Sequence, residues 1–327
     1  MILGGDIGGT HTRLAVFDDD GGRPAGATDH TYPSREHDGL VVIVHRFLEE
    51  TGARVGAACF GVAGPVKNGR SVATNLPWII DAAELARELG ARAWVINDLE
   101  ATAWGITALG PDELAEVSPG APDAAGNIAV VAAGTGLGEA GLYWDGQRHH
   151  PFATEGGHAT FAPDDDVEAE LFAWLRRRIG EHVSWERVVS GPGLVSIYEF
   201  LRDTGRGEEP AWLADALRED DPGSTISRLA LEQKSPLCVE ALHRFVGLYG
   251  SEAGNAALKI MATGGVYLGG GIAPRIVSKL VDGTFRARFL AKGRMRPLLE
   301  SIPVRVVLND QAGLLGAGRC AAVRIAS

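Results

Sequence analysis

Three glycine-rich turns, each directly after an apolar stretch typical of a strand, are the clearest candidates for chemistry. They lie at residues 5–10, 134–138 and 269–271. Glycine lets backbone N–H groups come within hydrogen-bonding distance of phosphate oxygens, and the threonine hydroxyls of the first two turns add a donor each. One such turn alone is as often an ordinary tight turn, but three together favour a phosphate ligand. The residues expected to contact it are Gly5, Asp6, Ile7, Gly8, Gly9, Thr10, Gly134, Thr135, Gly136, Gly269, Gly270 and Gly271.

Asp6 is an unusual residue for such a turn, because a carboxylate repels phosphate oxygens. Its presence is explained if a divalent cation lies between the carboxylate and the phosphates. Neither of the first two turns is a Walker A motif, since no Lys-Ser/Thr pair follows the glycines.

Asn97 and Asp98 stand where a predicted strand at 94–96 ends and a predicted helix begins. Ligands of open α/β sheets bind at such strand ends, so Asp98 could act there as a general base. The alternative is that Asp98 only caps the following helix. The dipeptide alone favours the cap.

A second polar group consists of Glu155 and His158, which flank two glycines, and of Glu186 further along the chain. A carboxylate can accept hydrogen bonds from two vicinal hydroxyls, and an imidazole adds a further polar contact. The alternatives are an exposed loop for Glu155 and His158, and an acid favoured by the helix dipole for Glu186. Mutually spaced groups of this kind discriminate strongly, because a ligand without the matching hydroxyl leaves buried polar groups unpaired.

Other polar clusters are weaker candidates. His149 and His150 have no third ligand near them in the sequence. Cys59, Cys238 and Cys320 are too far apart for a metal knuckle, and their odd number argues against a disulfide framework. We therefore expect no zinc.

The elements that position these residues alternate between strands and helices, which predicts an α/β domain with a mixed sheet. Asp81, with Glu84 three residues later, is the predicted N-cap of a helix. Predicted strands of the N-terminal third are residues 1–8, 12–17, about 25–32, 55–62 and 94–96, and predicted helices are residues 40–48, 82–89 and 97 to about 109.

The same pattern starts again after residues 110–126, a stretch rich in Pro, Gly, Asp and Ala that is the best candidate for a domain boundary. At an offset of 125 residues, five of the thirteen positions from Gly9 and Gly134 onward are identical, a weak match that nevertheless indicates an internal duplication. The remainder is mainly helical. Predicted strands here are 127–133, 139–144 and 304–308, and predicted helices include 235–259 and 311–325.

The composition limits the class of protein. A chain of 327 residues is long enough for about two domains, and 45% hydrophobic with 22% charged residues is typical of a globular protein. The net charge of −11 disfavours nucleic acids, anionic membranes and polyphosphate chains as main partners. We find no stretch long and apolar enough for a membrane span and no signal-peptide pattern. With its odd number of cysteines, the chain is predicted to be cytoplasmic.

The three glycine turns together resemble the phosphate-1, phosphate-2 and adenosine motifs of the sugar kinase, actin and heat-shock-chaperone ATPase superfamily. Within it, the chain resembles the short, hexokinase-like ATP-dependent glucokinases of bacteria over essentially its whole length. The segments 155–158 and 186–194, in this order and spacing, are the most specific. Glu139 is a departure, because a small or apolar residue is expected there and its charge would lie near the ATP phosphates. The other matching segments are Thr74-Asn75-Leu76-Pro77-Trp78, Ile96-Asn97-Asp98 and residues 308–318.

The resemblance implies an α/β, two-lobed actin-like ATPase (ribonuclease H-like) fold with an interlobe cleft. The small lobe would contain residues 1–109 and about 300–327, and the large lobe residues 110–299. The implied reaction is the phosphorylation of D-glucose at its 6-hydroxyl by ATP with Mg²⁺, which gives glucose 6-phosphate and ADP. A homodimer is implied as well, since dimers are common in the family.

The resemblance also implies that Asp98 is the general base for the 6-hydroxyl, which reverses the preference for a helix cap. Phosphoryl transfer needs only a weak, well-placed base, because most of its catalysis is positioning and charge neutralisation. The glycine turns would hold ATP, with residues 269–271 facing the adenosine, and Asp6 would hold Mg²⁺ through water. The residues implied to bind the sugar are Asn97, Asp98, Glu155, His158 and Glu186.

Two alternatives remain: a kinase for mannose, fructose or an N-acetyl hexosamine, and a non-catalytic sugar sensor. The related repressor–kinase group usually carries a Cys/His zinc motif after its Glu-x-x-His, whereas this chain has no cysteine between Cys59 and Cys238. A DNA-binding sensor would need a module ahead of the first glycine turn, and only four residues precede Gly5.

Overall fold

The computed structural model describes residues 1–18, 24–73 and 76–326, so Thr74 and Asn75 of the matching segment 74–78 lie outside the described residues. The chain forms two compact units. Unit 1 comprises Met1–Glu113, Pro151–Ala153 and Asn309–Ser327, and unit 2 comprises Leu114–His150 and Thr154–Leu308. Both are built of α-helices around a mixed sheet, so the predicted α/β class is confirmed.

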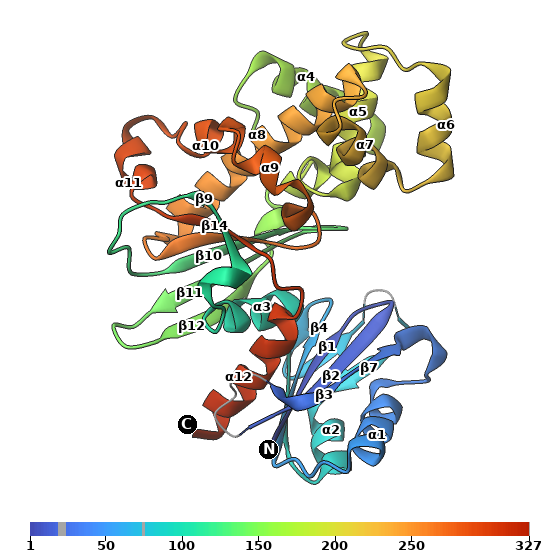
Figure 1. Ribbon diagram of the computed structural model, residues 1–327, viewed down its shortest axis with the longest axis vertical. Helices are drawn as coiled ribbons and strands as arrows, with labels where there is room; N and C mark the ends of the chain where they lie inside the picture. Colours follow the sequence, from blue (N-terminus) through green and yellow to red (C-terminus); the bar gives the residue numbers. More distant parts are fainter. Residues whose placement is uncertain (19–23, 74–75, 327) are drawn as a thin grey trace. The chain divides into compact units, whose positions relative to one another are not determined.

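Unit 1 contains a five-stranded sheet in the order β3-β2-β1-β4-β8 (Figure 1). Strand β1 pairs antiparallel with β2 across the first glycine turn and parallel with β4. The strands are β1 (Ile2–Ile7), β2 (His11–Phe17), β3 (Pro24–Pro33), β4 (Ala57–Val62) and β8 (Arg92–Asn97), with a small separate sheet of β5 (Val66–Lys67), β6 (Arg70–Val72) and β7 (Ile79–Asp81). The helices are α1 (Leu40–Thr51), α2 (Ala82–Leu89), α3 (Asp98–Ile106) and α12 (Ala312–Ala326).

Both faces of this sheet are buried, which is why its central strands are apolar throughout rather than alternating. On β4, Ala58 and Phe60 belong to the core that α1 and α2 cover, whereas Cys59 belongs to the core that α12 covers. Asp81 accepts hydrogen bonds from the N–H groups of Ala83 and Glu84, so the predicted N-cap of α2 is confirmed.

The C-terminal helix α12 packs closely on α3, the helix that begins at Asp98. Glycines make this approach possible: a Cβ on Gly105 would lie 1.9 Å from the carbonyl oxygen of Ala312, and one on Gly316 would lie 1.7 Å from that of Ala101. The position of Asp98 therefore depends on a segment more than two hundred residues away in the sequence.

Unit 2 repeats the arrangement of unit 1 in a six-stranded sheet, β12-β11-β10-β13-β14-β9. Strand β10 pairs antiparallel with β11 across the second glycine turn and parallel with β13, as β1 pairs with β2 and β4. This equivalence supports the internal duplication indicated by the sequence. The strands are β9 (Leu114–Ser118), β10 (Ile128–Ala133), β11 (Leu137–Trp144), β12 (His149–Thr154), β13 (Gly265–Gly269) and β14 (Val304–Val307).

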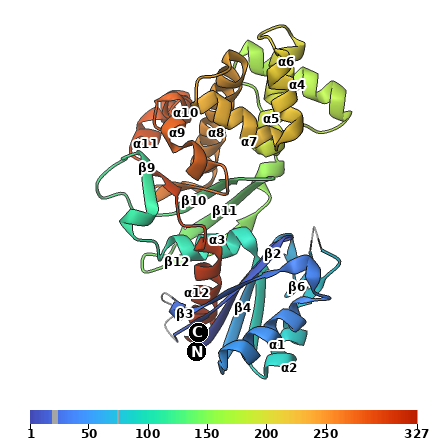
Figure 2. The same cartoon turned by 45° about the vertical axis from the view of Figure 1, so that its right-hand side comes forward.

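The helices of unit 2 form a larger body than those of unit 1. Figure 2 shows α5, α7 and α8 together, and these three helices contact one another, while α8 also contacts β10. The helices are α4 (Asp166–Ile179), α5 (Gly191–Asp203), α6 (Ala211–Glu219), α7 (Pro222–Leu231), α8 (Pro236–Ile260), α9 (Val277–Leu280), α10 (Thr284–Phe289) and α11 (Arg296–Glu300). Among the described residues, no helix is both long and apolar enough to cross a bilayer.

Candidate active site

The junction of β8 and α3 presents Asn97 and Asp98 in different roles. Asn97 is the N-cap, since its Oδ1 accepts hydrogen bonds from the N–H groups of Leu99 (2.9 Å) and Glu100 (3.3 Å). Its Nδ2 donates to the carbonyl oxygen of Gly64 at 3.1 Å, which fixes the amide orientation. Asp98 is the first residue of the helix, so capping does not account for its presence.

The carboxyl group of Asp98 has an electrostatic environment suited to proton exchange. Burial raises its pKa to about 6, the N–H of Leu99, 2.9 Å from Oδ1, acts in the opposite direction, and the negative charge of Asp6 raises it further. A group with this pKa is ionised at pH 7 but binds a proton far more readily than an exposed aspartate. It can therefore serve as a general base.

Asp6 occupies the end of β1, opposite Arg13 of β2. Burial raises its pKa, the charge of Arg13 lowers it, and the charge of Asp310 raises it. Arg13 also forms an ion pair with Asp310 at 3.0 Å and donates to its carbonyl oxygen at 3.1 Å. In the part of the chain that the structure describes, no group of three or more His, Cys, Asp or Glu side chains could hold a metal by itself.

The first glycine turn is held by its own backbone and by Ser34. The N–H of Gly8 donates to the carbonyl oxygen of His11 at 2.9 Å. The Oγ of Ser34 donates to the carbonyl oxygen of Gly8 at 2.8 Å, while the N–H of Ser34 donates to that of Thr10 at 2.9 Å. The turn is thereby fixed before any ligand binds, which reduces the entropy cost of binding.

In unit 2, the second glycine turn lies directly against Glu186. The Oε2 of Glu186 accepts a hydrogen bond from the N–H of Leu137 at 3.0 Å, and a Cβ on Gly136 would lie 2.5 Å from the same oxygen. The N–H of Gly191 donates to the carbonyl oxygen of Gly134 at 2.8 Å. The structure thus brings together the turn and the start of the 186–194 segment.

Glu155 and His158 lie on a loop, residues 155–158, that joins this group of segments. The Nε2 of His158 lies 3.9 Å from Oε2 of Glu155, and their side chains are 60% and 70% exposed, so a ligand can reach both. The Nε2 of His182 lies 2.9 Å from the carbonyl oxygen of His158. The N–H of Trp185, the residue before Glu186, donates a hydrogen bond to the carbonyl oxygen of Ala159 at 3.0 Å. The 155–158 loop and Glu186 are therefore parts of one local structure.

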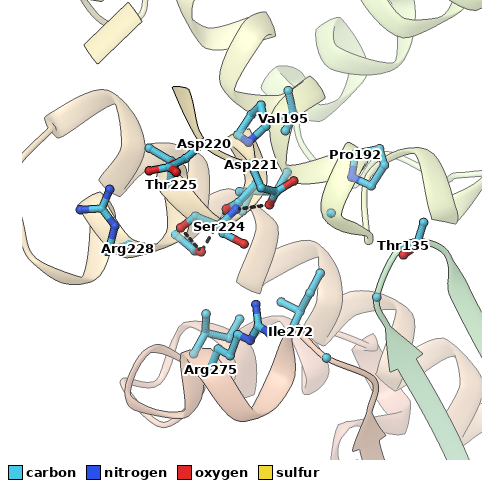
Figure 3. A pocket seen from close by; sticks show the side chains of 18 of the residues that line it. Thr135, Pro192, Val195, Asp220, Asp221, Ser224, Thr225, Arg228, Ile272 and Arg275 are labelled. Carbon is cyan, nitrogen blue, oxygen red and sulfur yellow. Dashed lines mark hydrogen bonds between the residues drawn. The ribbon is translucent and has the colours of Figure 1, made fainter. Parts of the chain in front are cut away.

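A cavity of about 1090 Å³ lies within unit 2, beside the second and third glycine turns (Figure 3). Gly134, Thr135 and Gly271 line it, whereas Gly136, Gly269 and Gly270 are not among its lining residues. The cavity is large enough for a nucleoside, and its walls are mainly apolar with a few polar groups, as is usual for small-molecule sites.

One wall of this cavity was missed by the sequence analysis. The start of α7 contributes Asp221 and Ser224, whose Oδ1 and N–H are joined by a hydrogen bond of 2.9 Å, and Ile272 and Arg275 face them across the space (Figure 3). A signal was present, because Asp221 followed by Pro222 is the typical sequence of an N-cap and the first helical residue. It predicts a helix start but not a ligand.

Glu139, the departure noted in the sequence, is not among the residues that line this cavity. It faces inward from β11 and is 4% exposed. A Cβ on Gly156 would lie 2.0 Å from its Oε2, so the carboxyl group lies against the 155–158 loop.

Comparison with known proteins identifies the family. The sequence model described as glucokinase matches residues 3–324. A glucokinase of Nostoc punctiforme is 40% identical over 98% of this chain and 99% of its own length, and one of Synechocystis is 40% identical over 98% of both. The crystal structure of a glucokinase from an Antarctic psychrotroph matches with a TM-score of 0.84 and 33% identity over 98% of both chains. These matches confirm the resemblance and the two-lobed sugar-kinase fold, and they show that the chain belongs to the glucokinase family.

Proposed function

We propose that this chain catalyses the reaction of its family, the ATP-dependent phosphorylation of D-glucose at the 6-hydroxyl, with Asp98 as general base. The observation that carries this assignment is the division of roles at the start of α3. Asn97 caps the helix, and Asp98 is left with a partly buried carboxylate of pKa about 6. A carboxylate in this position can accept the hydroxyl proton as the oxygen attacks the γ-phosphorus.

The sugar is bound, in this proposal, by Asn97, Glu155, His158 and Glu186 together with Asp98. The exposure of Glu155 and His158 supports a ligand-binding role, because neither side chain is buried in the packing of the core. One oxygen of Glu186 accepts from Leu137, so the same residue links sugar recognition to the position of the second glycine turn.

Asp6 would hold Mg²⁺ through water, and the residues present fit such an ion. The negative charge of Asp310 raises the pKa of Asp6, and that of Asp6 raises the pKa of Asp98, so a cation beside Asp6 would offset the cost of these two buried carboxylates. The absence of a complete protein cage among the described residues fits Mg²⁺ too, since this ion usually takes one or two carboxylates and completes its shell with water and phosphates. When bound, it neutralises the developing charge on the phosphoryl oxygens.

ATP is proposed to place its adenosine in the unit 2 cavity, and Gly271→Val tests this placement. A Cβ at Gly271 meets no atom within 4 Å, so the substituted side chain would enter the cavity without disturbing the protein. We expect the KM for ATP to rise about tenfold or more, because each unmade nucleoside contact costs of the order of 1 kcal/mol, and the KM for glucose to stay within twofold. Steady-state rates with each substrate varied measure both constants.

The control for this substitution is Gly56→Val, in unit 1, where a Cβ also meets no atom within 4 Å. Both constants should be unchanged in it. An unchanged KM for ATP in Gly271→Val would place the nucleotide elsewhere.

The pKa of Asp98 predicts how activity depends on pH. Because the base must be deprotonated, kcat/KM for glucose should fall about tenfold per pH unit below about pH 6. Initial rates between pH 4.5 and 8 measure this, and an unchanged circular dichroism spectrum over the same range excludes unfolding as the cause. A plateau that extends to pH 5 would contradict the assignment of the base.

The alternatives of a mannose, fructose or N-acetyl hexosamine kinase are separated by measuring ADP release with each sugar. A kcat/KM for glucose at least tenfold above the values for the other sugars supports the proposal. A higher kcat/KM for another hexose would identify that hexose as the substrate instead of glucose. No turnover with any hexose would favour a sugar sensor.

The expected homodimer is tested by light scattering of the purified protein.

A further inference from the structure

We propose that Glu139 is a positioning residue: its buried carboxyl group packs against Gly156 and thereby fixes the position of the 155–158 loop. The inference rests on the proposed binding of sugar by Glu155 and His158. Glu139 itself would touch neither substrate, since it is 4% exposed.

Glu139 is connected to this loop by two sets of contacts, one through its side chain and one through its main chain. Its Oε2 occupies the space next to Gly156 that a Cβ would need, at 2.0 Å. Its carbonyl oxygen accepts from Oγ1 of Thr154 at 3.0 Å, and the same Oγ1 accepts from the N–H of Gly156 at 3.2 Å. The strand β11 and the loop are therefore connected through both the side chain and the main chain of one residue.

On its other side, Glu139 faces a second buried carboxyl group, that of Glu252 on α8, which is 0% exposed. Glu252 accepts hydrogen bonds from Nδ2 of Asn255 at 2.8 Å and from Nζ of Lys259 at 3.2 Å. Among the described residues, Oε1 of Glu139 is buried without a hydrogen bond, and Glu252 itself is the side chain to which Glu139 is hydrogen-bonded. An ionised group in that position would be costly.

Burial and the neighbouring charge of Glu252 raise the pKa of Glu139 to about 8, while Lys259 acts in the opposite direction. Near pH 7 the group is therefore mostly a neutral acid, and it becomes a second buried negative charge as the pH rises through about 8. The titratable groups that interact with it are Glu252, Lys259 and Tyr249 on α8, and the loop against which it lies carries Glu155 and His158. Ionisation would repel Glu252 and loosen the support of Gly156.

The experiment compares Glu139→Gln with Glu139→Ala. Glutamine keeps the size and neutrality of the protonated acid, so glucose KM should stay within twofold of the unchanged protein at pH 7. Alanine removes the support, and glucose KM should rise about tenfold, since a small displacement of binding groups is costly, while kcat and the KM for ATP stay within twofold. Above pH 8 the glucose KM of the unchanged protein should rise, and that of Glu139→Gln should not.

A double-mutant cycle with Gly156→Ala keeps the proposal testable if Glu139→Ala folds poorly. The added methyl collides with the carboxyl group in the parent protein, whereas in Glu139→Ala only the contact of 3.3 Å with the Cβ remains, so the two effects on glucose KM should be strongly non-additive. Additive effects, together with identical pH profiles for the parent and Glu139→Gln, would overturn the proposal. Equal losses of kcat in both Glu139 variants would overturn it as well, because they would indicate a direct role in the reaction.

Amide hydrogen exchange of residues 154–159 separates failure of this inference from failure of the proposed function. Faster exchange in Glu139→Ala with raised glucose KM supports both. Faster exchange with unchanged glucose KM would show that the loop does not bind sugar, which overturns both. Unchanged exchange, in a protein where Glu155→Ala still raises glucose KM, would overturn only the role of Glu139.

Discussion

Replacing Asp98 by asparagine is expected to lower kcat about a hundredfold or more and to change glucose binding much less. Asparagine keeps the shape of the side chain and can still accept from the N–H of Leu99, but it cannot take up the proton of the 6-hydroxyl. Steady-state kcat and the glucose dissociation constant from calorimetry measure the two effects. A turnover within threefold of the parent value would remove Asp98 from the role of base.

The matched control is Asp81→Asn, an acid-to-amide change at the start of another helix of unit 1. Asp81 uses its side chain to cap α2, and asparagine caps equally well, so kcat and stability should both be unchanged. The same kcat loss in both variants would indicate a general effect of removing charge.

The Asp98→Asn protein should also be more thermally stable than the parent at pH 7.5. The pKa of Asp98 rises from 3.8 to about 6 on folding, so the native state binds more protons between about pH 4 and pH 6 and stability falls over that interval as the pH rises. Above pH 6 the full cost of the buried charge is present, and asparagine does not carry it. The difference in Tm between the two proteins should therefore be larger at pH 7.5 than at pH 4. An equal difference at both values would show that the charge is not the cause.

Elements governed by local sequence were predicted closely. Asp81 and the helix after it agree with the structure residue by residue, because a cap and an amphipathic repeat are decided within one or two turns of chain. The two hairpins around the first and second glycine turns were predicted for the same reason. The strands β9 and β12 were not; β9 lies within the Pro- and Gly-rich stretch 110–126 and pairs with β14, which is distant in sequence.

The site was predicted less completely, for a related reason. Asn97 and Asp98 were found together, but only the hydrogen bonds show that Asn97 is the cap. Asp221 and Arg275 come from helical segments that the sequence places far apart, and the cavity they line exists only after packing. The inward direction of Glu139 follows from its register opposite Val131 in a sheet buried on both faces, which no local pattern shows.

Glu155→Ala is expected to raise the KM for glucose about ten- to a hundredfold and to leave the KM for ATP within twofold. A carboxylate that accepts hydrogen bonds from two sugar hydroxyls is worth about 1.5–3 kcal/mol per charged hydrogen bond, and each 1.4 kcal/mol corresponds to about tenfold in affinity. The side chain is 70% exposed and contributes little to the packing of unit 2, so the substitution should not lower the Tm. Steady-state rates with each substrate varied, together with thermal unfolding, measure these quantities.

Glu208→Ala is the control, because Glu208 is also an exposed acid on the surface of the same unit. It loses the same charge, so a long-range electrostatic effect on ATP would appear in both variants, whereas loss of a sugar contact appears only in Glu155→Ala. Deoxyglucoses sharpen the comparison: a sugar that lacks the hydroxyls held by Glu155 should bind the parent and the variant with similar affinity, because the contact is already missing. If ATP affinity fell instead and glucose affinity were retained, the 155–158 loop would belong to the nucleotide, and the assignment of sugar recognition to Glu155 and His158 would be wrong.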